Sequence, residues 1–248
     1  MSLTLTVLGS SGMFATEDRA CSGYVLEYGD TRLWIEAGAG SWRNLQAHVD
    51  HRQLDGVVLS HRHPDHTSDI FQADHARQFG GPAPLPRIPL WAPPETLERV
   101  CAFVSDLDVS FDMHPLVAGD DLDIAGTRFH FVAMAHPVET LGMRIERDGA
   151  VLAYSADTGP SADLDSLARD ADVFVCEATL QDSDRAWEGH MSASGAGRVA
   201  AAIGVSRLLL THLPPNRNLD RSLHEAQTES GAVPVALASD GMRMQVGA

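Results

Sequence analysis

The chain has 248 residues, of which 44% are hydrophobic and 21% are charged, a composition typical of a globular α/β protein. Its 34 acidic and 18 basic residues give a formal net charge of −16. This charge disfavours long nucleic acids as partners, because their affinity depends largely on neutralising phosphates. No apolar run approaches the ~20 residues that a helix needs to cross a membrane, so we expect no membrane association.

The start of the chain and its cysteines predict a cytoplasmic protein. Residues 3–8 alternate like a β-strand and lack the basic beginning of a secretion signal. Cys21, Cys101 and Cys176 are odd in number and scattered, so we expect buried free thiols in a reducing compartment. The length suits one domain spanning residues 1–248, or at most two small ones.

The first half of the sequence alternates predicted strands and helices. Gly29-Asp30 separates two strand-like runs and predicts a hairpin, whereas Gly80-Gly81 ends a helix. The expected strands cover residues 3–8, 23–28, 31–36, 57–60 and 88–91, and the expected helices lie at 42–49, after residues 61–66 through Phe79, and at 95–104.

A histidine-rich segment, His-Arg-His-Pro-Asp-His, directly follows the predicted buried strand at 57–60. His61 and His63 are two residues apart, so an extended chain points both imidazoles to the same side. The proline favours a helix start, which places Asp65 and His66 in a tight turn or a first helical turn facing the same pocket. Three imidazoles and one carboxylate are a concentrated set of metal ligands. A chance histidine-rich loop is the alternative, and it would gather four polar groups at a strand end for no physical reason.

The second half again mixes strands with helices, and two such halves imply two sheets covered by helices, an α/β class of fold. Strand character covers residues 122–135, 143–155, 173–176 and 207–210, with a closing pair of strands within 233–246. Helices are expected at 162–171, 192–203 and 220–229.

Three further ligand-type residues stand at the ends of apolar runs in this half. His136 follows 131–135, Asp157 follows 152–156, and His212 follows 208–211. Any one of them alone is more often an ordinary strand-end residue. Together with the histidine-rich segment, they predict a larger metal centre.

The H-x-H-x-D-H pattern after an apolar strand resembles the signature of the metallo-β-lactamase superfamily. The resemblance implies that superfamily's αβ/βα four-layer sandwich, with a metal site at one edge. It also implies two divalent ions, zinc by preference, with manganese or iron as alternatives. By resemblance, the first ion would be held by His61, His63 and His136, the second by Asp65, His66 and His212, and Asp157 would bridge both.

Several short patterns narrow the resemblance to the ribonuclease Z group, over residues 5–215. They are Ser155-Ala156-Asp157-Thr158, Cys176-Glu177-Ala178-Thr179, His190-Met191-Ser192 and Leu210-Thr211-His212. The resemblance to this group also implies that the protein forms a homodimer.

His190, Glu177 and Asp65 are the residues expected to act in catalysis. His190 lies two residues before Ser192, a residue type common at helix N-caps, and could protonate a leaving alkoxide as general acid. Glu177 could orient that imidazole. The alternative for His190 is a surface loop histidine.

One departure from ribonuclease Z concerns substrate size. Members of that group that process tRNA carry a long arm between the segments matching His136 and Asp157, whereas here only 20 residues lie between them. The sequence therefore favours a small phosphodiester, with a 3′,5′-cyclic nucleotide such as cyclic AMP as first choice. The alternatives are a tRNA 3′-processing endonuclease, a thioester or lactone hydrolase, and a degenerate member that serves as an interaction subunit.

Overall fold

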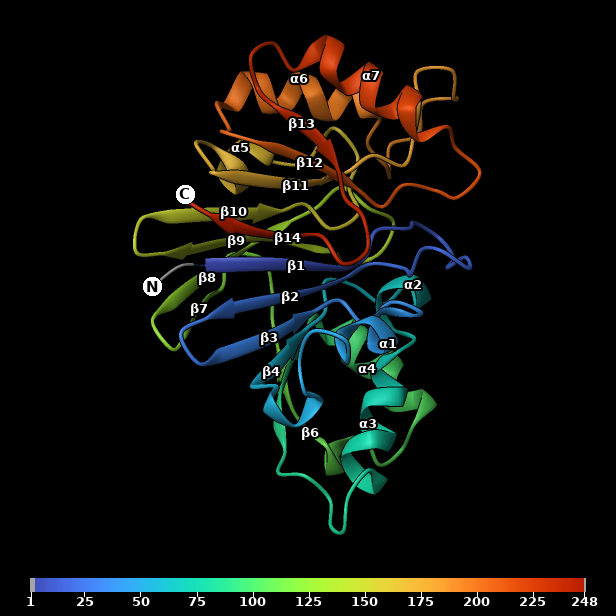
Figure 1. Ribbon diagram of the computed structural model, residues 1–248, viewed down its shortest axis with the longest axis vertical. Helices are drawn as coiled ribbons and strands as arrows, with labels where there is room; N and C mark the ends of the chain where they lie inside the picture. The colour runs from blue at the N-terminus through green and yellow to red at the C-terminus, as the bar shows by residue number, and fades with distance from the viewer. Residues whose placement is uncertain (1–2, 248) are drawn as a thin grey trace. The chain divides into compact units, whose positions relative to one another are not determined.

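The computed structural model describes residues 3–247 and contains two compact units. The N-terminal unit comprises Thr4–Leu116 and Ser239–Met244, and the C-terminal unit comprises Val117–Ala238 with residues 3 and 245–247. Each unit is built mainly on one seven-stranded sheet (Figure 1). Within residues 3–247, no helix is long and apolar enough to cross a membrane.

The sheet of the N-terminal unit has the order β14-β1-β2-β3-β4-β5-β6. Strands β1 to β3 form an antiparallel meander, and β3 to β6 run parallel. The carboxyl ends of β3, β4 and β5 therefore meet at one edge. The strands are β1 (Leu3–Gly9), β2 (Gly23–Tyr28), β3 (Thr31–Ile35), β4 (Gly56–Val58), β5 (Ile88–Ala92), β6 (Phe111–Pro115) and β14 (Arg243–Val246).

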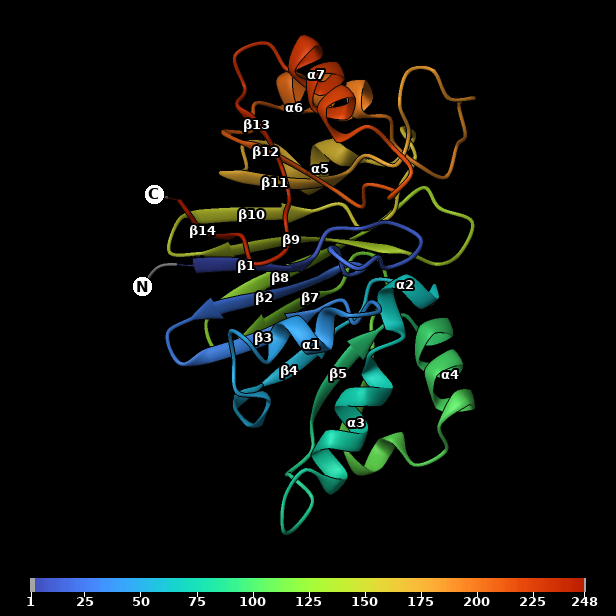
Figure 2. The ribbon, with the colours of Figure 1, turned by 45° about the vertical axis from the view of Figure 1, so that its right-hand side comes forward.

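Helices cover one face of this sheet (Figure 2). Leu45, Ile70 and Leu97 pack in one hydrophobic cluster with Trp34 and Val57 from the strands. The helices are α1 (Ser41–Leu45), α2 (Pro64–Thr67), α3 (Ile70–Phe79) and α4 (Pro94–Phe103), and two short 3-10 turns, η1 (His51–Gln53) and η2 (Leu107–Val109), complete the unit.

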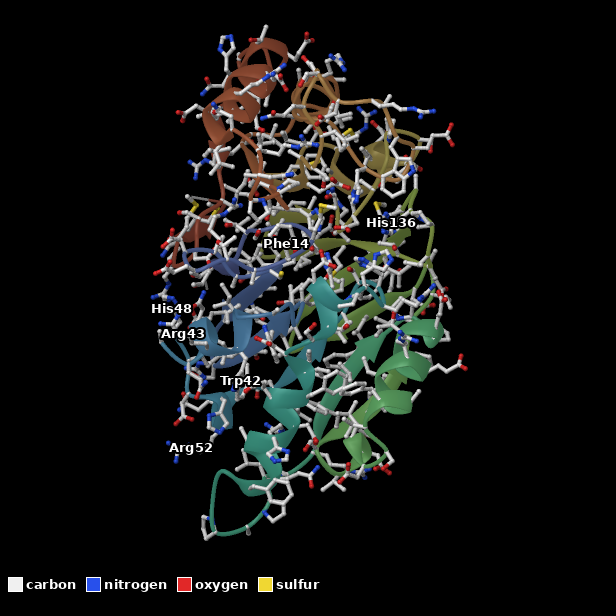
Figure 3. The ribbon with its side chains drawn as sticks, turned by 90° about the vertical axis from the view of Figure 1, so that its right-hand side faces the viewer. Phe14, Trp42, Arg43, His48, Arg52 and His136 are labelled. Carbon is white, nitrogen blue, oxygen red and sulfur yellow. The ribbon has the colours of Figure 1, made fainter. Side chains whose placement is uncertain are left out.

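Two helices follow β4: α2 holds the expected first turn with Asp65 and His66, and α3 is the expected helix that ends at Phe79. The Asp69 N–H donates at 2.7 Å to the carbonyl of Ala37, a residue outside the helices. The Asp69 carboxylate accepts the Trp42 N–H at 2.8 Å. These bonds separate α2 from α3 and tie both to the loop after β3. Helix α1 also ends at Leu45, earlier than expected. Within this helix the Trp42 side chain is buried and the neighbouring Arg43 is exposed (Figure 3).

The sheet of the C-terminal unit has the order β13-β12-β11-β10-β9-β8-β7. Strands β7 to β10 are antiparallel, and β10 to β13 are parallel. Asp148 and Gly149, with φ of 49° and 87°, form the two-residue turn between β9 and β10. The strands are β7 (Asp121–Ile124), β8 (Thr127–Ala133), β9 (Leu141–Arg147), β10 (Ala150–Tyr154), β11 (Val173–Glu177), β12 (Leu208–Thr211) and β13 (Val235–Leu237).

Three helices cover one face of the second sheet: α5 (Leu164–Ala168), α6 (Ala193–Ile203) and α7 (Leu219–Glu229). Leu167, Ala196 and Ala226 from these helices pack with Phe174 and Leu210 from the strands. The Ser192 side chain caps α6 by accepting the Gly195 N–H, as expected. Mixed sheets with helices in both units confirm the α/β class.

Two further predictions need correction. The closing strands do not pair with each other: β13 joins β12, whereas β14 belongs to the other sheet, where Gly241 N–H donates to Val7 O at 2.8 Å. Strand β6 was not expected, because this edge strand is largely exposed beyond Phe111 and lacks a buried apolar pattern.

Cys101 is exposed, contrary to the expectation that all three thiols are buried. Burial raises the pKa of the Cys21 thiol to about 12, and it also raises the pKa of the fully buried Cys176. Burial also raises the pKa of the Cys101 thiol, so its exposure is what distinguishes it. A soluble disulfide reagent should therefore label one thiol rapidly in the native protein and three after denaturation. Cys101→Ser should abolish the rapid reaction, whereas two or more rapidly reacting native thiols would contradict this assignment.

Candidate metal centre

The N-terminal unit gathers three of the predicted imidazoles after β4. His61 Nε2 lies 3.1 Å from His63 Nδ1, and the ring centroids of His61 and His66 are 4.2 Å apart. His61 and His66 are buried. As the spacing predicts, His61 and His63 point to the same side, and Asp65 and His66 lie in α2, which begins at the proline.

Neighbouring groups hold this cluster in place. Ser60 Oγ lies 2.9 Å from His61 Nδ1, and Asp65 Oδ2 accepts the Met13 N–H at 2.8 Å. Glu36, which the sequence analysis missed, is fully buried, and its Oε2 lies 3.5 Å from His66 Nδ1. It directly follows β3, so the strand-end rule that selected the other residues could also have found it.

The C-terminal unit gathers the other predicted ligands around Asp157. Asp157 Oδ1 lies 3.3 Å from His212 Nε2, and Asp157 Oδ2 lies 3.9 Å from the Nε2 of His136, which follows β8 (Figure 3). His190 is near as well, because ligand-type atoms of Asp157, His190 and His212 all lie within 4.8 Å of one another. The two carboxylate oxygens thus face different imidazoles.

Hydrogen bonds determine which ring nitrogens carry protons. The His136 Nδ1–H donates to the Gly189 carbonyl at 2.8 Å, since a carbonyl can only accept. The Thr179 hydroxyl donates to Glu177 Oε2 at 2.7 Å and therefore accepts from His212 Nδ1 at 2.8 Å. Both imidazoles then turn an Nε2 lone pair toward the Asp157 carboxylate.

This arrangement fits a metal ion. A lone pair facing a carboxylate oxygen is repulsive by itself and becomes attractive when a cation lies between them. Metal-binding histidines generally donate the other ring N–H to a carbonyl or a similar acceptor, as His136 does here. Burial lowers the pKa of His136, opposed by the Asp157 charge, and so favours the neutral imidazole that binds metal.

The backbone is strained at three strand ends that carry these groups. Glu36, Ala156 and His212 have φ of 60°, 50° and 52°, which is uncommon for residues other than glycine. Glu36 and His212 directly follow β3 and β12, and Ala156 lies two residues after β10. Such conformations persist only where surrounding contacts hold them, and they concentrate at functional sites.

The Glu177 carboxylate contacts His190, as expected from their sequence context. Glu177 Oε1 accepts from His190 Nδ1 at 2.7 Å and from the Thr158 N–H at 2.7 Å. Glu177 is fully buried, and His190 is 9% exposed. His190 therefore lies beside Asp157 and His212 with Nδ1 engaged and Nε2 left for another partner. This contact argues against a surface loop histidine.

Residues 31–213 match the Beta-lactamase superfamily domain, which covers well over half of the chain. The chain is a metallo-hydrolase of the β-lactamase superfamily. Membership accounts for a divalent-metal site built from histidine and aspartate. Which residue holds which ion stays a prediction.

Three relatives are similar to most of the chain. An uncharacterized protein of Mycobacterium leprae (strain TN) is 35% identical, covering 99% of this chain and 90% of the relative. The probable metallo-hydrolase YhfI of Bacillus subtilis (strain 168) is 32% identical, covering 94% of this chain and 97% of the relative. Ribonuclease Z of Myxococcus xanthus (strain DK1622) is 27% identical, covering 98% of each, in an alignment of 303 positions that exceeds the 248 residues of this chain.

The crystal structure of Bacillus subtilis YhfI superposes with a TM-score of 0.89 and 28% identity, covering 98% of this chain and 99% of that chain. It is described as a metallo-β-lactamase fold protein, which confirms the predicted αβ/βα fold class. The kinship with ribonuclease Z is confirmed as well.

Thr179 was also missed from the sequence, because its importance depends on contacts with Glu177 and His212. Replacing Thr179 with valine removes the hydroxyl that holds His212 in its tautomer, while keeping the shape of the side chain. We expect Thr179→Val to weaken Zn²⁺ binding by roughly 10- to 100-fold, measured by competition with a chromogenic chelator. Thr179→Ser, which retains the hydroxyl, should bind nearly as tightly as the wild type; equal affinity in the folded valine variant would refute the role of the hydroxyl.

Proposed function

We propose that this metallo-hydrolase is a dinuclear phosphodiesterase that acts on a small phosphodiester, with a 3′,5′-cyclic nucleotide as first choice. Two zinc ions suit the imidazole and carboxylate donors. The assignment follows the superfamily order: His61, His63 and His136 for one ion, Asp65, His66 and His212 for the other, and Asp157 for both. When bound, such ions neutralise phosphate charge and lower the pKa of water.

The observation that supports a phosphodiesterase is the pairing of His190 with Glu177 beside Asp157 and His212. Glu177 holds the Nδ1–H, so Nε2 is the atom that can deliver a proton to a leaving oxygen. An alkoxide leaving group needs that proton, and supplying it is the usual role of a general acid. The thiolate released from a thioester leaves without one. The pair therefore favours phosphodiester over thioester hydrolysis.

The β9–β10 hairpin supports a small substrate. It fills the chain between His136 and Asp157 with two strands and a two-residue turn, which leaves no length for a tRNA-binding arm. Its basic residues are already engaged: Arg144 bonds Glu146 and the Arg169 carbonyl, and Arg147 bonds the Ala125 carbonyl. With a net charge of −16, little basic surface remains for a long polyanion.

Replacing His190 with alanine tests its proton transfer. His190→Ala should retain bound metal but lower turnover of alkyl phosphodiesters by ~10²–10⁴-fold, the usual contribution of a general acid. The loss should be smaller for p-nitrophenyl esters, whose leaving group is stable as an anion. His130→Ala is a matched control, because His130 also contacts a carboxylate, Asp121 at 2.9 Å, in an exposed position. Equal losses on both ester types would show that His190 does not transfer the proton.

The proposed substrate class is tested by comparing cyclic AMP with a precursor tRNA in the same metal and salt conditions. We expect turnover of cyclic AMP with modest salt dependence, because binding relies on few charge contacts, and little cleavage of the tRNA. Efficient 3′ cleavage of the tRNA without hydrolysis of any small cyclic diester would assign the chain to the tRNA endonucleases instead. Hydrolysis of a lactone or thioester alone would favour the other alternative.

A further inference from the structure

Trp187 differs from the other three tryptophans of the chain because its ring is accessible. It is 49% exposed, whereas Trp34, Trp42 and Trp91 are 8% exposed or less. Its ring lies against the backbone of Gly189, where a Cβ atom would be 2.8 Å from the ring. An aromatic ring held in this way presents an apolar surface to solvent at little further cost in conformational entropy.

Three contacts fix the loop that carries Trp187. The Glu188 carbonyl packs so closely on Gly159 that a Cβ there would lie 1.6 Å from its oxygen. The Gly189 carbonyl accepts from His136 Nδ1 at 2.8 Å, and His190 is bound to Glu177. Because these anchors are the three residues that directly follow the tryptophan, they hold its backbone close to His136 and His190.

The Trp187 ring lies beside the proposed reaction centre. Its centroid is 4.9 Å from that of His190 and 6.3 Å from that of His136, both in edge-to-face orientation. It also lines a cavity of about 240 Å³ together with His190, Met191, Leu180 and Pro160. This volume is below the ~300–1,000 Å³ of pockets that enclose a drug-sized ligand, and it suits a single ring system.

We propose that Trp187 is the platform on which the base of the substrate stacks, with the phosphodiester held toward His190. The inference rests on the proposed function and deepens it, because it makes a nucleoside phosphate, rather than an alkyl phosphodiester, the preferred substrate. Stacking on an aromatic face tolerates any base, so the platform favours nucleosides as a class, and purines over pyrimidines through their larger face.

Adenosine, which has no phosphate to bind metal, is the probe for this subsite. Equilibrium dialysis with the folded protein should show saturable binding, weakened roughly 5- to 150-fold by Trp187→Ala, as expected for the loss of one base–aromatic stack. Trp187→Phe should retain most of the affinity, because an aromatic face remains. Phe79→Ala is the matched control, since Phe79 is 66% exposed at the end of α3, and it should bind adenosine like the wild type.

Fluorescence provides a second measurement. Trp187 is the accessible tryptophan, so adenosine should protect wild-type emission from iodide quenching and have no such effect in Trp187→Phe. Absence of adenosine binding, or equal binding by the wild type and the folded Trp187→Ala variant, would overturn the proposal.

Hydrolysis separates this proposal from the proposed function. With Trp187→Ala, the KM for cyclic AMP should rise while the KM for a base-free cyclic ribose phosphate stays unchanged. Hydrolysis of cyclic AMP without adenosine binding would reject the stacking platform and retain the phosphodiesterase. Adenosine binding lost in Trp187→Ala, without hydrolysis of any cyclic nucleotide, would support the platform and reject the cyclic-nucleotide substrate.

Discussion

The buried Glu177 carboxylate is the interaction on which the C-terminal part of the site depends. It accepts the Thr158 N–H after β10, the Thr179 N–H and hydroxyl after β11, and Nδ1 of His190. Through the Thr179 hydroxyl it also sets the tautomer of His212 after β12. A buried carboxylate is stable only with several such donors. Its need for donors therefore couples three adjacent strand ends and the proposed general acid in one hydrogen-bonded network.

A similar constraint operates in the N-terminal unit, around Glu36. Its carboxylate accepts the Ser60 N–H at 3.2 Å and lies 3.5 Å from His66 Nδ1, and it is fully buried after β3. Each unit thus places a buried glutamate at a strand end behind its histidines, in contact with one imidazole and with backbone amides: that of Ser60 for Glu36, and those of Thr158 and Thr179 for Glu177. In both units the glutamate stands behind the predicted ligands, where it can orient imidazoles without occupying a ligand position.

Parallel strands explain why residues distant in sequence converge in each unit. Strands β10, β11 and β12 run parallel, so the residues after them, including Asp157 and His212, emerge at the same edge of the sheet. The positive φ of Ala156 and His212 turns the chain sharply there. A strained backbone costs folding free energy, and the network around Glu177 offers the contacts that hold it. The hydrogen bonds around Glu177 therefore hold both the strained backbone and the side chains of the predicted ligands at this sheet edge.

The amino-acid sequence by itself determined the identity of the ligand-type residues and most of the strands. His61, His63, Asp157 and His212 follow apolar runs, and that signal is local, because spacing along a strand decides which way a side chain points. Only the tertiary structure decided where β13 and β14 pair, where α2 ends and α3 begins, and that Glu36 and Thr179 support the histidines. It also placed Trp187 beside His190. These features depend on hydrogen bonds and packing between segments far apart in the chain, which no local pattern encodes.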